Sequence, residues 1–161
     1  MSFYYTEMDS SIDKLFLLAT DAGMTGIYFS YDEIPNQLKE SMSQQDDHLV
    51  LKEAIIQLRE YFQGKRQTFT VPLSIQGTTF QKAVWEQLLA IPYGETRSYA
   101  DIAAAIENEK AVRAVGQANK ANRLPILIPC HRVIGKNKSL TGYAGNQIDK
   151  KEQLLILEGV L

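Results

Sequence analysis

The first half of the chain alternates short apolar runs with turn-forming residues. Aromatic and aliphatic residues cluster at 3–8, 14–20 and 26–29, and the residues at 9–11 and 21–23 favour turns. Runs of this length bounded by turns are typical of strands that pair with their neighbours in sequence. The pattern therefore predicts a small antiparallel sheet.

A helical pattern follows the predicted sheet between residues 49 and 62. Apolar residues recur there every three or four positions, which places them on one face of a helix that can pack on the sheet. This face consists of Leu51, Ile55, Leu58 and Phe62. Asp46 or Asp47 could cap the first turn, and Gly64 lies just past the last one.

A connector then marks a boundary within the chain. Residues 64–77 lack a helical pattern and contain one extended piece at 70–75. We place the boundary near residue 76, so that residues 1–76 form an N-terminal lobe and residues 77–161 a C-terminal domain. The predicted fold class is α/β of the α+β kind, with a small antiparallel sheet and helix followed by a mostly helical domain.

The second half begins with a strong helix signal. Thr78 and Gln81 have the spacing of a capping box, and Pro92 and Gly94 end the helix. Between them lies an apolar stripe made of Phe80, Val84, Leu88 and Ile91.

Two shorter helices are predicted next, at 98–106 and at about 109–121, and their tight connection is typical of a helix-turn-helix. Ser98 with Asp101 can cap the first of them. The second has a polar, partly basic face that could contact nucleic acid, formed by Arg113, Gln117 and Lys120. Its core-facing positions are Val112, Val115 and Ala118. A surface ion pair between Glu109 and Arg113 would equally explain the charges.

Charge is distributed unevenly between the two halves. The formal net charge is −2, but residues 1–76 carry 6 basic and 11 acidic side chains, whereas residues 77–161 carry 11 basic and 8 acidic ones. A polyanion should therefore meet the second half. No apolar run approaches the roughly 20 residues that cross a bilayer. The lone cysteine and the absence of a signal-peptide pattern predict a soluble, cytoplasmic protein with no membrane partner.

The only cysteine in the sequence, Cys130, follows an apolar run and Pro129 and precedes His131. A nearby base raises the thiolate fraction of a cysteine, which is its nucleophilic form. A buried, inert cysteine beside a satisfied core histidine is the alternative. Glu158 lies at the C-terminal end of a predicted helix, where the helix dipole disfavours an anion, so a specific partner for it is expected.

Residues 129–133, with the sequence PCHRV, resemble the active-site signature of the methylated-DNA–protein-cysteine methyltransferases, the O6-alkylguanine-DNA alkyltransferase family. The resemblance is strong over about residues 77–160 and weaker over residues 1–76. Further matching segments are 94–103 (GETRSYADIA), 113–116 (RAVG), 122–133 (the spacing from an asparagine to the cysteine), 142–143 (GY) and 154–159 (LLILEG).

The resemblance implies direct repair of DNA in a single turnover without a cofactor. Cys130 would accept the alkyl group of O6-alkylguanine, with O4-methylthymine a second candidate substrate. His131 would draw the thiol proton through a water, and Glu158 would orient that imidazole. Tyr99 would assist departure of the guanine, and Asn122 would tie the recognition helix to the cysteine loop.

The family also implies that a monomer binds double-stranded DNA from the minor groove and rotates the damaged nucleotide out of the stack. Arg113 would fill the vacated space. The pocket for the base would be formed by Tyr143, Val133 and Ala144. The other predicted DNA contacts are Ala114, Gln117, Lys120 and Arg132.

The sequence differs from the family pattern at several positions, and two other functions are alternatives to alkyl transfer. Asn119 and Lys120 stand where the family commonly has small residues, and Asn146 replaces an expected glycine. The N-terminal lobe has no cysteine and only His48, so no structural zinc site is expected there. A lesion-sensing DNA binder without transfer, and a cytosolic cysteine hydrolase, are the alternative functions.

Overall fold

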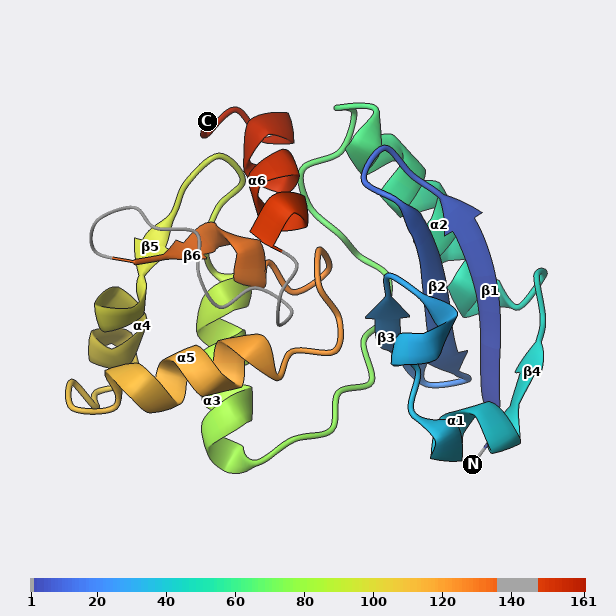
Figure 1. Cartoon of the computed structure of the whole chain (residues 1–161), viewed down its shortest axis with the longest axis horizontal. Coiled ribbons are helices and arrows are strands. Elements are labelled where there is room, and N and C mark those ends of the chain that lie inside the picture. The colour runs from blue at the N-terminus through green and yellow to red at the C-terminus, as the bar shows by residue number, and fades with distance from the viewer. Residues whose placement is uncertain (1, 136–147) are drawn as a thin grey trace. The chain divides into compact units, whose positions relative to one another are not determined.

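The computed structural model describes residues 2–135 and 148–161, and its contacts group into two units, Met1–Gln76 and Gly77–Leu161 (Figure 1). The first unit contains the sheet, and the second is mostly helical. The α+β fold class predicted from the sequence is confirmed. None of the helices in the described ranges is both long enough and apolar enough to cross a membrane.

The sheet of the first unit has four strands in the order β3-β2-β1-β4. Strands β1 (Phe3–Asp9), β2 (Lys14–Thr20) and β3 (Gly23–Tyr28) pair antiparallel, as predicted. Strand β4 (Met42–Gln44) was not predicted and runs parallel to β1, so the sheet is mixed. Its three residues are too few to produce an alternating pattern that could be recognised in the sequence.

Helix α2 (Leu49–Phe62) occupies the predicted span and contacts β1, β2 and β3. The predicted cap is wrong: His48 is the N-cap residue and its side chain makes no capping bond. The Asp46 carboxylate instead accepts a hydrogen bond of 2.8 Å from the Thr6 hydroxyl. Gly64, at φ +75°, follows the helix in the left-handed region that glycine tolerates.

The segment before α2 and the connector after it complete the first unit. A 3-10 turn, η1 (Tyr31–Glu33), and the short helix α1 (Asn36–Ser41) precede β4. In the connector, the Met24 amide donates to the Pro72 carbonyl and the Ser74 amide to the Met24 carbonyl, both at 2.8 Å. The extended piece predicted at 70–75 therefore pairs with the start of β3.

The second unit begins with α3 (Thr79–Leu89), and the predicted capping box of Thr78 and Gln81 is present. After a turn, β5 (Arg97–Ser98) leads into α4 (Tyr99–Ala105), whose capping box of Ser98 and Asp101 is also as predicted. Helix α5 (Val112–Lys120) follows. The three helices contact one another in pairs, so α4 and α5 form the predicted helix-turn-helix on a support provided by α3.

The chain then passes through a buried loop into a 3-10 turn, η2 (Cys130–Arg132). Strand β6 (Val133–Ile134) pairs parallel with β5. The last helix, α6 (Ile148–Leu157), packs against η2 (Figure 1). This arrangement brings the end of α6 to the turn that carries the cysteine.

Candidate active site

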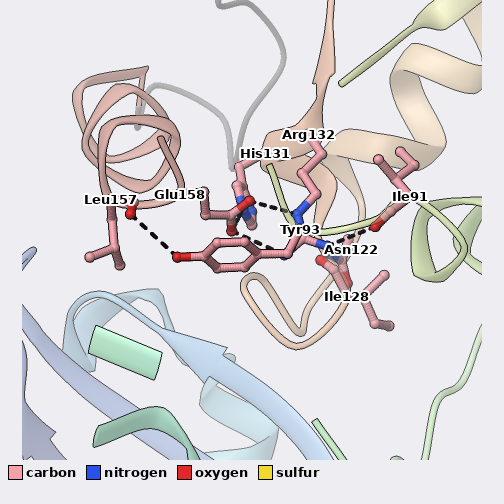
Figure 2. Close-up of polar contacts among 8 residues, drawn as sticks. All are labelled: Ile91, Tyr93, Asn122, Ile128, His131, Arg132, Leu157 and Glu158. Atoms are coloured by element: carbon pink, nitrogen blue, oxygen red, sulfur yellow. Dashed lines mark hydrogen bonds and ion pairs between the residues drawn. The ribbon is translucent and has the colours of Figure 1, made fainter. Parts of the chain in front are cut away.

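The side chain of Asn122 holds the loop before Cys130 in shape. Asn122 donates to the Ile128 carbonyl at 2.9 Å (Figure 2). It also accepts from the Leu124 amide at 2.9 Å. Ile126, between these residues, has φ +76°, which a β-branched residue rarely adopts. Such backbone strain persists only where the surroundings fix the chain. Asn122 therefore has the position expected for a link between the end of α5 and the cysteine loop.

The cysteine is almost completely buried, with 1% of its surface exposed. Burial raises the pKa of the Cys130 thiol to about 11, although a hydrogen bond from Asn122 and the charge of Lys151 oppose the change. At neutral pH the resting side chain is therefore a thiol. A reaction that needs the thiolate requires a base that removes this proton.

His131 and Glu158 form a buried pair next to the cysteine. The His131 Nε2 atom lies 2.6 Å from Glu158 Oε2, and neither side chain is exposed (Figure 2). Burial lowers the pKa of His131, while the hydrogen bond and charge of Glu158 raise it. The resting imidazole is therefore neutral, and Nε2 carries the proton that it donates to the carboxylate. The specific partner expected for Glu158 is present.

Arg132 was predicted to contact DNA, but the structure directs its side chain into the protein. Its side chain is 6% exposed, and it donates to both carboxylate oxygens of Glu158, at 2.8 and 3.1 Å. A further bond of 2.7 Å joins it to the Ile91 carbonyl. With its donors directed inward at these groups, the guanidinium is not available to a phosphate.

Three other residues near the turn were missed by the sequence analysis. Lys151 is fully buried and donates to the Val133 carbonyl; burial lowers its pKa to about 8. Asn119 is buried in α5 and donates to the Cys130 carbonyl at 3.4 Å. Tyr93 donates to the Leu157 carbonyl at 3.3 Å. Their partners lie far away in the sequence, so no local pattern signals these contacts.

Helix α5 divides its residues between surface and core as predicted, with one exception. The polar face is exposed, whereas Val115 and Ala118 are buried. The exposed residues are Arg113, Ala114, Gln117 and Lys120. Val112 was expected in the core but is 38% exposed, because the helix begins there. Glu109 precedes the helix, so the helical spacing proposed for its ion pair with Arg113 does not apply.

Of the remaining predicted site residues, the structure describes Tyr99 and Val133. Tyr99 is half-buried at the start of α4, and a Cβ atom added to Gly116 would lie 4.0 Å from its ring. The tyrosine therefore packs beside α5. Val133 is buried in β6. Tyr143 and Ala144, like Asn146, lie outside the described residues.

Within residues 2–135 and 148–161, no three His, Cys, Asp or Glu side chains are grouped so that they could hold a metal ion.

The described residues thus place one buried cysteine, a histidine–carboxylate pair and a helix-turn-helix in a single unit. This combination defines a class of protein in which a nucleophilic cysteine with a neighbouring base is joined to a nucleic-acid-binding motif.

Comparisons with known proteins agree with that class. The family model described as 6-O-methylguanine DNA methyltransferase, DNA binding domain, matches residues 79–160. The model described as the ribonuclease-like domain of the same methyltransferase matches residues 3–75.

Individual relatives match along nearly the whole chain. The constitutive methylated-DNA–protein-cysteine methyltransferase of Bacillus subtilis is 50% identical over 160 residues, covering 98% of this chain and 96% of the relative. The corresponding methyltransferase of Methanosarcina mazei is 46% identical over 159 residues, covering 96% of each. The crystal structure of Mycobacterium tuberculosis OGT in complex with DNA has a TM-score of 0.87 at 41% identity, covering 96% of this chain and 92% of that one. The chain belongs to the methylated-DNA–protein-cysteine methyltransferase family.

Proposed function

We propose that this protein repairs DNA by moving the alkyl group of O6-alkylguanine, methyl in the first instance, onto Cys130. The observation that carries the proposal is the placement of the chain's only cysteine beside the His131–Glu158 pair, within a chain of this family. The family's relatives are named for transfer of a methyl group to a protein cysteine. In this chain no other cysteine could accept it.

The chemistry is a single displacement at the alkyl carbon. The sulfur–carbon bond forms as the bond from that carbon to the guanine O6 breaks. The thiol proton passes to His131, through a water, and the carboxylate of Glu158 stabilises the resulting imidazolium. Tyr99 supplies a proton or hydrogen bond to the departing guanine. The product thioether has no easy reverse reaction, so each molecule acts once.

A base inside a duplex cannot reach a cysteine that is 1% exposed, so the damaged nucleotide must leave the stack. The exposed face of α5 is suited to the minor groove, where recognition is nearly independent of sequence. Arg113 would fill the vacated position, and Ala114, Gln117 and Lys120 would contact the surrounding DNA. Tyr143, Val133 and Ala144 would form the pocket for the base.

The two units would then have separate roles, with residues 77–161 binding DNA and carrying out the transfer and residues 1–76 forming the N-terminal lobe. A monomer suffices because all the proposed catalytic residues belong to one chain. We place the reaction in the cytoplasm, where a single cysteine remains reduced. O4-methylthymine is a second candidate substrate for the same site.

A titration tests the proposal. Purified protein is added in steps to a fixed amount of duplex DNA that carries one O6-methylguanine, and the remaining modified base is measured by chromatography after digestion. We expect one modified base to be lost per protein molecule, and none with Cys130→Ala. Repeated turnover would favour a hydrolase-like reaction, and binding of the lesion without loss of the modified base would favour a sensor.

A further inference from the structure

The surroundings of Arg132 differ from those of a surface cation. Its guanidinium donates to Glu158 Oε1 at 2.8 Å, to Glu158 Oε2 at 3.1 Å and to the Ile91 carbonyl at 2.7 Å (Figure 2). The ring of Tyr93 lies 5.7 Å from the guanidinium carbon. Contacts on several sides therefore fix this arginine in one orientation.

The carboxylate that it contacts serves His131 at the same time. Glu158 Oε2 is 2.6 Å from His131 Nε2 and also accepts from the Arg132 guanidinium. A carboxyl group in buried surroundings tends to bind a proton, and a bidentate guanidinium opposes this while it restricts the carboxylate to one rotamer. The oxygen that faces the imidazole is thus both charged and held in place by Arg132.

We propose that Arg132 is a positioning residue for methyl transfer, which keeps Glu158 ionised and directed at His131 so that the imidazole can take the thiol proton. The inference rests on the proposed function of the site. It assigns to Arg132 a role that acts through Glu158, without contact to DNA.

The charged groups around this pair decide the direction of the effect. Cys130 and Arg132 lie beside His131 on η2, Lys151 comes from α6, and Tyr93 comes from the segment after α3. Burial lowers the pKa of His131 most. Among its neighbours, the hydrogen bond and charge of Glu158 raise that pKa more than the charges of Arg132 and Lys151 lower it. If Glu158 becomes protonated without Arg132, the larger contribution disappears, and His131 becomes a weaker base.

The test measures methyl transfer in a single turnover, with protein in excess over duplex DNA containing O6-methylguanine, across a range of pH. Arg132→Met removes the charge and keeps an unbranched apolar stem, and Arg132→Lys restores the charge without the bidentate geometry. We expect Arg132→Met to be about tenfold slower or more at neutral pH, with its rate profile displaced to higher pH. Arg132→Lys should recover part of the rate.

Arg66→Met is the matched control. Arg66, in the first unit, also pairs with a carboxylate, Glu60 at 2.9 Å, and with a backbone carbonyl, that of Thr68 at 3.0 Å. Losing this partly exposed ion pair, which lies in the other unit, should leave both the rate and the pH profile at the wild-type values. Thermal unfolding of every variant separates a loss of stability from a loss of rate.

A double-mutant comparison distinguishes positioning from a general structural role. If Arg132 acts through Glu158, the variant with both Arg132→Met and Glu158→Gln should be no slower than Glu158→Gln alone. Multiplied losses, an unchanged pH profile in Arg132→Met or a shift to lower pH would each overturn the inference. If Arg132→Met does not fold, Arg132→Lys with and without Glu158→Gln supports the same comparison. A wild-type protein that transfers no methyl group would instead contradict the proposed function.

Discussion

Replacing Asn122 with alanine should destabilise the second unit, because the side chain satisfies two buried backbone groups. Its oxygen accepts from the Leu124 amide, and its amide donates to the Ile128 carbonyl. Leu124 and Ile128 are 1% and 0% exposed, so water cannot replace either bond in the folded loop. The strained backbone at Ile126 lies between these two attachments and depends on them.

The two losses differ in size. The Ile128 carbonyl keeps a second donor, the Cys130 amide at 2.7 Å, so losing the Asn122 bond costs about 0.5–1.5 kcal/mol. The Leu124 amide loses the Asn122 oxygen as its acceptor and is left unsatisfied, which costs about 1–3 kcal/mol. We therefore expect Asn122→Ala to lower the free energy of unfolding by about 2–4 kcal/mol.

Urea unfolding followed by tryptophan fluorescence measures this quantity in the relevant unit. Trp85 is the chain's single tryptophan, and its indole in α3 donates to the Ala118 carbonyl in α5 at 2.9 Å. Asn108→Ala, at an exposed position before α5, is the control and should stay within about 0.5 kcal/mol of wild type. A loss in Asn122→Ala no larger than in this control would show that the two Asn122 bonds do not stabilise the second unit.

Three further results are expected. The rate of alkylation of Cys130 in the folded protein should rise only as pH approaches about 11, because burial disfavours the thiolate and raises the pKa of the thiol. In urea, the alkylation rate should follow the ordinary thiol pKa of 9.0. Rapid labelling of the folded protein at neutral pH would contradict this. Gln57→Met should lower the free energy of unfolding, measured by circular dichroism, by about 2–4 kcal/mol, because the Thr70 and Val71 amides lose their buried acceptor; a loss under about 0.5 kcal/mol would show that the connector is held otherwise. Arg113→Ala should slow transfer from duplex DNA by about tenfold or more but leave transfer from a free O6-alkylguanine base unchanged, since no stack must be filled; equal losses with both substrates would argue against that role.

Local features of the fold could be predicted well from the sequence. The span of α2 and both capping boxes depend on residues within one or two helical turns, so their spacing is visible in the chain. The cap of α2 could not be predicted in this way. Asp46 is a suitable capping residue, but its carboxylate pairs with Thr6, which lies 40 positions earlier.

The same distinction applies to the site. The nucleophile and its neighbouring base are adjacent in the sequence, and the position of Glu158 at a helix end indicated a partner for it. Arg132 was predicted to contact DNA because an arginine in a family motif suggests that role, whereas the structure pairs it with Glu158, 26 positions away. Lys151 was missed because its burial results from the packing of α6 against η2, which no local pattern reveals.

Intact-protein mass spectrometry tests the transfer of a methyl group to Cys130 most directly. The purified chain is mixed with excess duplex DNA carrying one O6-methylguanine and then digested for peptide mapping. We expect a gain of the mass of one methyl group, located on Cys130 and absent in Cys130→Ala. An unmodified wild-type protein, or a methyl group on any other residue, would contradict it.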